Sequence, residues 1–321
     1  MGFVYNQLFK RLPYPTGSYA GKTVIVTGSN TGLGLEAARH FARLGASKLI
    51  LGVRNLKKGE EAKKDIESTT KCGKNVIEVW KVDMSSYDSV KQFATKVNKK
   101  LERLDTFLAN AGVAKTRFEL AEENETSITV NVVSTFLLVG LIMPKLKETA
   151  LKFHTRPNLT ITSSEVHAWT KFPAKSAPEG KIFDTLSDKD FLEKNMGDQY
   201  QVTKLLEVLA VRYLVEHHDF PVTIDLVNPG FCKSQLGREV NSWIFSLGQL
   251  ILAISAEAGS RNLVFAASRD ATYNGNYVSY CELTQPSDFV LSDEGKKVQE
   301  RVGNELMKKL ETIQPGITEN F

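Results

Sequence analysis

The sequence predicts a doubly wound α/β fold in three layers, in which helices cover both faces of a parallel sheet. Two observations predict it. From residue 23 onward, short β-branched and apolar runs alternate with amphipathic segments, and the first run leads into a glycine-rich turn. A strand, a glycine-rich turn and a helix, in that order, open a Rossmann-type fold. The 321 residues, 42% hydrophobic and 24% charged, have the composition of a globular chain.

The predicted elements follow one another in regular order. Strands are predicted at the short apolar and β-branched runs Thr23–Val26, Lys48–Val53, Val76–Val82, Thr106–Ala109, Leu159–Thr162, Val222–Val227 and Tyr277–Tyr280. Helices are predicted between them, at an amphipathic stretch from Leu33 that ends at Gly45, and at Leu56–Ile66, Tyr87–Leu101, Glu122–Ala150 and Gln199–His217. Right-handed crossovers would join these strands into one parallel sheet. Because no repeat or linker divides the chain, we expect residues 1–321 to form a single domain.

Two long insertions interrupt the alternation, at residues 165–198 and 231–260. Both follow the carboxyl end of a strand, which is where ligands bind in such sheets. Insertions of this length in a compact domain are usually functional. We therefore expect a substrate-binding excursion at 165–198 and a lid at 231–260. The apolar run Trp243–Ile254 would supply a wall for a bulky substrate.

Composition excludes several classes of function. The net charge of +4 is too small for a nucleic-acid footprint. The three cysteines lie far apart without a histidine cluster, so neither a disulfide scaffold nor a metal site is expected. Residues Met1–Tyr19 lack a secretory signal, which favours a cytoplasmic protein. The apolar runs Val130–Pro144 and Trp243–Ala256 fall short of the roughly 18 residues of a membrane span, although the second leaves peripheral membrane contact open.

The glycine-rich turn predicts a dinucleotide site. It consists of Gly28, Ser29, Asn30, Thr31, Gly32, Leu33 and Gly34, between the first strand and the first helix. Glycines let backbone N–H groups approach a ligand closely, and the positive end of the following helix suits a pyrophosphate. A tight structural turn would use the same glycines, but the placement between a strand and an amphipathic helix favours a dinucleotide.

The end of the second strand indicates which dinucleotide. A carboxylate there would hold a ribose 2′-hydroxyl, whereas an arginine accommodates a 2′-phosphate. Here Arg54 stands at that position, Lys57 and Lys58 follow, and Glu60 is the first acidic residue. We therefore expect NADP(H). The alternative is that Arg54 only solvates the strand end.

Tyr200 and Lys204 stand four residues apart in a predicted helix, so they share one face. The pKa of free tyrosine is about 10, too high for proton transfer at neutral pH. A neighbouring ammonium favours the phenolate and brings the pKa closer to the working pH of a general acid or base. The pair therefore predicts proton transfer, although tyrosine and lysine also share many exposed helix faces.

Further motifs match a known family in the right order. They are Asp83-Met84 after the third strand, Asn110-Ala111-Gly112 after the fourth, Asn131, Ser164 after the fifth and Asn228-Pro229-Gly230 after the sixth. With the turn and the Tyr-x-x-x-Lys motif, residues 20–235 resemble the short-chain dehydrogenase/reductase family. The long gap between Ser164 and Tyr200 resembles its retinol-dehydrogenase-like and WW-domain-oxidoreductase-like branch. The sequence of the turn is similar to that of fungal members of this branch, several of which serve secondary metabolism.

The resemblance implies a set of site residues. Catalytic roles fall to Asn131, Ser164, Tyr200 and Lys204. Cofactor contacts fall to the seven turn residues, Arg54, Asp83, Met84, Asn110, Ala111, Gly112, Tyr200, Lys204, Pro229, Gly230 and Ser234, the last in a place where the family often has threonine. Ser163 adjoins Ser164, and only one of the two can face the substrate if the strand keeps its period of two. The family pattern selects Ser164.

The implied reaction is hydride transfer from NADPH to the carbonyl carbon of a ketone or aldehyde. Tyr200 would donate the proton, Ser164 would hydrogen-bond the oxygen, and Asn131 would link Lys204 to solvent through a water. The expected partner is a bulky, apolar small molecule, and a homo-oligomer is left open. The alternatives are alcohol oxidation with NADP or NAD, a non-redox step such as cyclisation or dehydration, and a binding protein without turnover.

Overall fold

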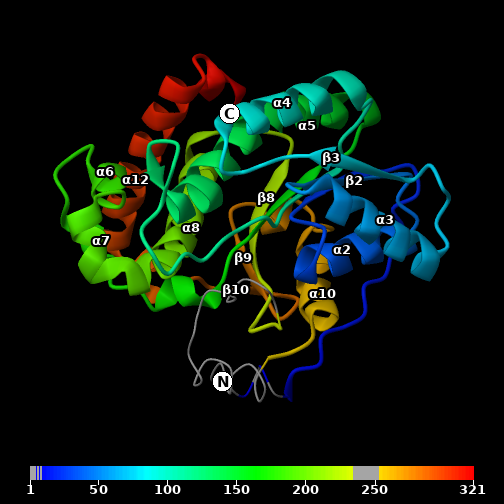
Figure 1. Ribbon diagram of the computed structural model, residues 1–321, viewed down its shortest axis with the longest axis horizontal. Helices are drawn as coiled ribbons and strands as arrows, with labels where there is room; N and C mark the ends of the chain where they lie inside the picture. Colours follow the sequence, from blue (N-terminus) through cyan, green and yellow to red (C-terminus); the bar gives the residue numbers. More distant parts are fainter. Residues whose placement is uncertain (1–4, 6, 8, 234–252) are drawn as a thin grey trace.

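The computed structural model describes residues 5, 7, 9–233 and 253–321. Its centre is an eight-stranded sheet in the order β10-β9-β8-β7-β4-β1-β2-β3 (Figure 1). The strands are β1 Thr23–Thr27, β2 Lys48–Val53, β3 Ile77–Lys81, β4 Thr106–Ala109, β7 Asn158–Thr162, β8 Thr223–Asn228, β9 Tyr277–Ser279 and β10 Glu282–Thr284. All neighbours are parallel except β10, which pairs antiparallel with β9. The predicted doubly wound α/β fold is confirmed.

Helices cover both faces of the sheet. Figure 1 shows α2, α3 and α10 below it, and α4 and α5 above it. The longer helices are α2 Gly32–Arg43, α3 Leu56–Thr70, α4 Tyr87–Lys100, α5 Ser134–Phe153, α8 Gln199–His217, α10 Ala256–Ala266 and α12 Asp293–Ile313. On one face α10 packs on α2, and on the other α4 packs on α5 and α12 packs on α8.

Successive residues of the strands point to opposite faces of the sheet, so their side chains lie in two separate hydrophobic cores. Ile25 and Ile50 belong to the core under α4, α5 and α8. Val24, Val26 and Leu49 belong to the core under α2, α3 and α10. Strands buried on both faces carry apolar residues at successive positions, which is why these runs lack a polar face. The helix stretch Ile128–Phe153 is long and apolar enough to cross a membrane, but 89% of its most apolar window is buried inside the protein.

The predicted helix Glu122–Ala150 begins too early. Residues up to Glu125 form a small hairpin, β5 Leu120–Ala121 with β6 Asn124–Glu125. The Glu125 carboxylate then accepts hydrogen bonds from the N–H groups of Ser127 and Ile128, which starts the helix there. Its first turns, η1 Ile128–Val133, are π-helical, and α5 continues from Ser134.

The two insertions differ in how much of them is described. The excursion at 165–198 contains η2 Glu165–Ala168, η3 Pro173–Ser176, α6 Ile182–Thr185, α7 Lys189–Asn195 and η4 Met196–Asp198. Of the predicted lid, residues 234–252, including Ser234 and most of the apolar run, lie outside the described residues. The described parts of that region hold a parallel bridge between Cys232 and Ile254 and the beginning of α10. The lid function stays a prediction.

Candidate active site

The site lies where the order of the strands reverses. The chain passes from β1 to β2 and β3 on one side, and then returns to β4, which pairs with β1 on the other side. The loops after β1 and β4 therefore diverge from adjacent carboxyl ends. Ligands of open α/β sheets bind in the crevice that such a reversal creates.

The turn after β1 needs its glycines. Gly28 has φ +66° and Gly32 has φ +58°, conformations that side chains disfavour. Gly34 is needed for space, since a Cβ there would lie 2.5 Å from Gly28 O and 2.5 Å from Asn110 Nδ2. The loop after β4 thus packs directly against the turn.

Asn110 and Ala111 hold the two loops together. The N–H groups of both donate to Thr27 Oγ1, at 3.0 and 3.1 Å, and Asn110 Nδ2 donates to Thr27 O at 3.0 Å. A Cβ on Gly28 would lie 3.0 Å from Ala111 Cα. The Asn-Ala-Gly motif therefore fixes the shape of the phosphate-binding turn.

Three features of the turn fit the pyrophosphate of a dinucleotide. Helix α2 starts at Gly32 with no side chain capping its first N–H groups, and its first turn carries no acidic residue. Those N–H groups and the helix dipole favour an anion. Ser29 Oγ is buried and has no hydrogen-bond partner among the described residues. The residues present thus fit the phosphate end of the cofactor that the sequence predicts.

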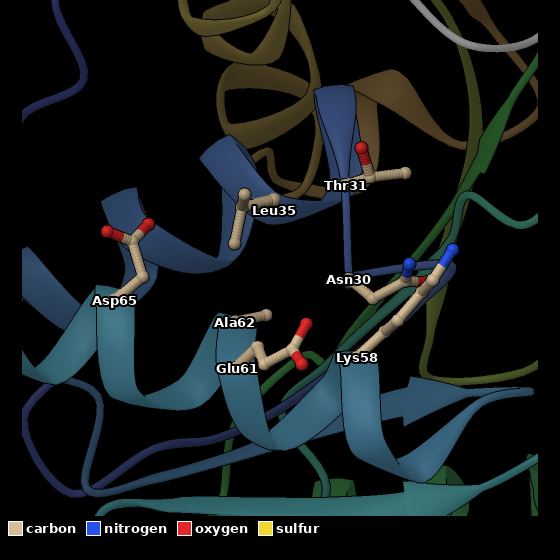
Figure 2. A pocket seen from close by; sticks show the side chains of 7 residues that line it. All are labelled: Asn30, Thr31, Leu35, Lys58, Glu61, Ala62 and Asp65. Atoms are coloured by element: carbon tan, nitrogen blue, oxygen red, sulfur yellow. The ribbon is translucent and has the colours of Figure 1, made fainter.

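A cavity of about 320 Å³ lies beside this turn, between α2 and α3 (Figure 2). It is lined by Asn30, Thr31, Leu35, Lys58, Glu61, Ala62 and Asp65. Figure 2 shows the Lys58 side chain extending toward Asn30 at one end of the cavity, with Asp65 at the other end. Asp65 is paired with Arg39 at 2.5 Å, so its charge is compensated.

Arg54 directly follows β2 and stands shortly before the first turn of α3, one of the two helices beside this cavity. Its side chain is exposed and makes no ion pair or hydrogen bond with a residue that the structure describes. Asn55, which follows it, accepts a hydrogen bond from Lys58 N at 3.0 Å and so caps α3. The cap joins the backbone of Lys58 to Asn55, so Arg54 and Lys58 both stand at the turn from β2 into α3, and Lys58 also lines the cavity.

Asp83 and Met84 follow β3, the strand at one edge of the sheet. Asp83 Oδ1 accepts from Ser85 N at 3.0 Å and from Ser85 Oγ at 2.6 Å, while Met84 is buried in the core. The carboxylate is therefore held in place by its own turn, with one oxygen outside these contacts.

Asn131 lies in the π-helical turn η1 and is buried. Its side chain makes paired hydrogen bonds with the backbone of Val113, both at 2.9 Å, and its Nδ2 also donates to Thr203 Oγ1 at 3.0 Å. The amide thus fastens the loop after β4 to helix α8. A local widening of a helix often marks a functional residue.

Ser164, Tyr200 and Lys204 come together next to Gly112, in the loop after β4. Lys204 Nζ lies 5.6 Å from the centroid of the Tyr200 ring, and a Cβ on Gly112 would lie 3.9 Å from the same Nζ. Burial raises the pKa of Tyr200, while the Lys204 charge and a hydrogen bond from Ser164 oppose the rise. Ser163 points elsewhere, toward Lys204 O at 3.3 Å.

Lys204 also has a buried anionic partner, Glu207, at 2.7 Å. Its Nζ donates as well to Thr162 O at 2.9 Å. Burial raises the pKa of the Glu207 carboxyl to about 7, although Lys204 lowers it. The lysine is therefore held on two sides within the protein.

The remaining loop of the site follows β8. Gly230 has φ +79°, and its N–H donates to Asn228 Oδ1 at 3.0 Å. Gln7 forms two hydrogen bonds with Phe231, from Nε2 to O at 2.6 Å and from the Phe231 N–H to Oε1 at 3.1 Å. The N-terminal segment thereby fixes the start of this loop. Among the described residues there is no cluster of three metal-ligating side chains.

Comparison with known proteins identifies the family. A family model described as short chain dehydrogenase matches residues 22–151. A short chain dehydrogenase/reductase of Cryptosporiopsis sp. is 59% identical over 324 residues, which cover 100% of both chains. The chain belongs to the short-chain dehydrogenase/reductase family. A short chain dehydrogenase of Emericella nidulans is 43% identical, with 85% of this chain and 88% of that protein covered.

Solved structures share the fold of the chain. One is a short chain dehydrogenase of Escherichia coli CFT073 in complex with NADPH, with a TM-score of 0.61, 20% identity and coverage of 83% of this chain and 99% of that chain. Another is an alcohol dehydrogenase of Thermococcus sibiricus in complex with 5-hydroxy-NADP, with a TM-score of 0.59, 19% identity and coverage of 80% and 95%. As a family member the protein is an oxidoreductase, and the prediction of a fungal type agrees with its relatives. The retinol-dehydrogenase-like branch stays a prediction.

Within this family site, the sequence did not reveal Glu207, Gln7 or the role of His167. His167 Nδ1 lies 2.8 Å from Ser164 O, and Nε2 accepts from Ser287 N at 3.0 Å. Because Nε2 accepts, Nδ1 donates, and the ring is neutral; burial correspondingly lowers its pKa. His167 therefore orients the backbone of Ser164, with both of its nitrogens engaged.

Proposed function

We propose that this short-chain dehydrogenase/reductase uses NADPH to reduce a ketone or aldehyde on a bulky, apolar small molecule, in fungal secondary metabolism. One observation carries the proposal: Ser164, Tyr200 and Lys204 converge, and Lys204 lies next to Gly112 in the loop after β4, the loop whose Asn110 and Ala111 hold the phosphate-binding turn. The fungal relatives and the long excursion at 165–198 support the substrate class.

Arg54, Lys58 and the turn support the choice of cofactor. The N–H groups at the start of α2 and the Ser29 hydroxyl would hold the pyrophosphate. Arg54 and Lys58 would hold a 2′-phosphate at the cavity between α2 and α3. The complexes of two similar structures with NADPH and 5-hydroxy-NADP agree with this assignment. When bound, NADPH supplies the hydride.

Four side chains, Tyr200, Ser164, Lys204 and Asn131, then have separate roles in proton transfer. Tyr200 donates its proton to the carbonyl oxygen, and the Ser164 hydroxyl stabilises the negative charge that develops there. Lys204 would hold the cofactor's ribose. It would also belong to the path that returns a proton to Tyr200. Asn131 keeps the loop after β4 in place through Val113, and a water beside it would link Lys204 to solvent.

Tyr200→Phe tests the proposal. The substitution removes the proton donor but keeps the ring, so turnover of a panel of aromatic and aliphatic carbonyls with NADPH should fall by about 10²–10⁴. The NADPH dissociation constant should stay nearly unchanged. Tyr213→Phe is the matched control, because Tyr213 lies on the same helix and donates to Asn304 Oδ1 at 2.8 Å, outside the site.

More than about half of the wild-type activity in Tyr200→Phe would overturn the assignment of Tyr200 as the acid. Turnover without NADPH consumption in the wild-type protein would instead favour a non-redox step. A faster reaction with an alcohol and NADP⁺, across the neutral range, would favour the oxidising direction.

A further inference from the structure

Glu207 forms an unusual contact for a buried carboxylate. It stands one helical turn after Lys204 on α8, and the side chains are only 2% and 6% exposed. Glu207 Oε1 receives the hydrogen bond from Lys204 Nζ at 2.7 Å. Glu207 Oε2 is buried without a hydrogen-bond partner among the described residues. A carboxylate in such surroundings is costly to bury, and one lysine is its compensation.

We propose that Glu207 is a positioning residue that cancels the charge of Lys204 beside Tyr200, so that Tyr200 keeps its proton and serves as the acid of carbonyl reduction. This rests on the proposed function and assigns its direction. A lone ammonium beside a tyrosine favours the phenolate, which is the form that accepts a proton from an alcohol. An ammonium that is paired with a carboxylate has much less of this effect.

The charges around Tyr200 agree with this role. Burial raises the pKa of Tyr200 most; the Lys204 ammonium lowers it, and the Glu207 carboxylate adds to the rise. The pKa of Glu207 itself, about 7, means that the carboxyl is ionised above neutrality.

Other titratable groups face the same cluster from neighbouring elements. Tyr277 on β9 is buried close to Tyr200 and Glu207, and its own pKa is raised well above the ordinary value by burial, so it stays neutral. Glu165 in η2 acts on Tyr277 and receives a hydrogen bond from Asn228 Nδ2 at 3.4 Å. The Ser163 hydroxyl lies beside Glu207 and lowers its pKa. Lys204 and Glu207 are the charged groups that act on Tyr200 among the described residues.

A titration of Tyr200 tests the proposal without any substrate. The tyrosinate absorbance of each protein is recorded against pH, and the curve of its Tyr200→Phe counterpart is subtracted. Glu207→Gln keeps the size of the side chain and removes the charge, so the midpoint of the difference curve should fall by about one pH unit or more. Glu207→Asp keeps the charge and should stay close to the wild-type midpoint. Glu216→Gln, on the same helix and paired with Lys296, is the matched control.

The same substitution is also made where no unpaired ammonium is left behind. If Glu207→Gln alone does not fold, the double variant Lys204→Met/Glu207→Gln decides the matter: a cancelled pair can be removed together with the midpoint staying close to wild type, whereas loss of an ammonium that Glu207 does not cancel would raise the midpoint. An unchanged midpoint after Glu207→Gln, or a Glu207→Asp protein that behaves like the glutamine variant, would overturn the proposal and show a merely structural role.

Kinetics then separate this inference from the proposed function. With NADPH and phenanthrenequinone as the probe, Glu207→Gln should lose reduction on the alkaline side of the pH profile, about one pH unit earlier than wild type. If Tyr200→Phe stays active, the proposed function fails, whatever the titration shows. If Tyr200→Phe is inactive but Glu207→Gln leaves the titration and profile unchanged, only the inference about Glu207 fails.

Discussion

Gly34→Ala is the sharpest test of the phosphate-binding turn. The added methyl group would lie 2.5 Å from Gly28 O and 2.5 Å from Asn110 Nδ2, so either the start of α2 must move away or Asn110 must release Thr27 O. Overpacking costs about 1–3 kcal/mol, and the lost hydrogen bond about 0.5–1.5 kcal/mol. Relaxation of the turn in the free protein would relieve this strain.

Binding NADPH would then require the strained turn to form again. A cost of about 2–4 kcal/mol raises the NADPH dissociation constant by about 30-fold to several hundred-fold, since about 1.4 kcal/mol is tenfold. Fluorescence titration with NADPH measures it, and a thermal melt reports the stability. Gly197→Ala is the control, because a Cβ there meets nothing within 4 Å. A dissociation constant within about threefold of wild type would refute the role of this turn in phosphate binding.

Two further substitutions probe the cofactor preference and the core. Arg54→Asp should shift the preference from NADPH toward NADH by about tenfold to more than a hundredfold, because a charge-assisted hydrogen bond contributes about 1.5–3 kcal/mol; an unchanged ratio of the two dissociation constants would sink the assignment. Asp225 is fully buried on β8 with a pKa raised well above its usual value by burial, so the native state binds a proton that the unfolded state releases. Its stabilising effect is complete below the unfolded pKa of about 3.9 and is lost as the pH rises. Asp225→Asn should therefore melt at a higher temperature than wild type at about pH 8, with a gap that closes toward about pH 4, whereas a pH-independent gap would contradict the linkage.

Local patterns predicted the elements whose sequence and burial agree. The bounds of β2, β4 and α8 match the prediction to the residue, because each is a continuous apolar or amphipathic run with clear ends. Helix α12 was missed although it carries a signal: Val298, Val302, Leu306 and Leu310 recur at helical spacing after the capping residue Ser292. Strand β10 has three residues and two of them are exposed, so it has little pattern to find.

The site shows the same division. Glycines at a strand-to-helix turn and Tyr-x-x-x-Lys are local patterns, and in the structure both lie against the loop after β4. Glu207 follows Lys204 by three residues, a spacing at which opposite charges also pair on solvated helix faces. Only the packing of α8 against the sheet turns that pair into a buried one. Gln7 and His167 likewise act through contacts with residues more than a hundred positions away.

The most direct test of the central claim is the transfer of deuterium. The protein is incubated with a carbonyl substrate from the panel and NADPH that is deuterated on either face of the nicotinamide C4, and the product is analysed by mass spectrometry. We predict that one of the two deuterated cofactors delivers its deuterium to the carbon that carried the carbonyl group, and that Tyr200→Phe abolishes this product. A product that forms without deuterium from either cofactor would contradict hydride transfer and place the chemistry of this site outside oxidation and reduction.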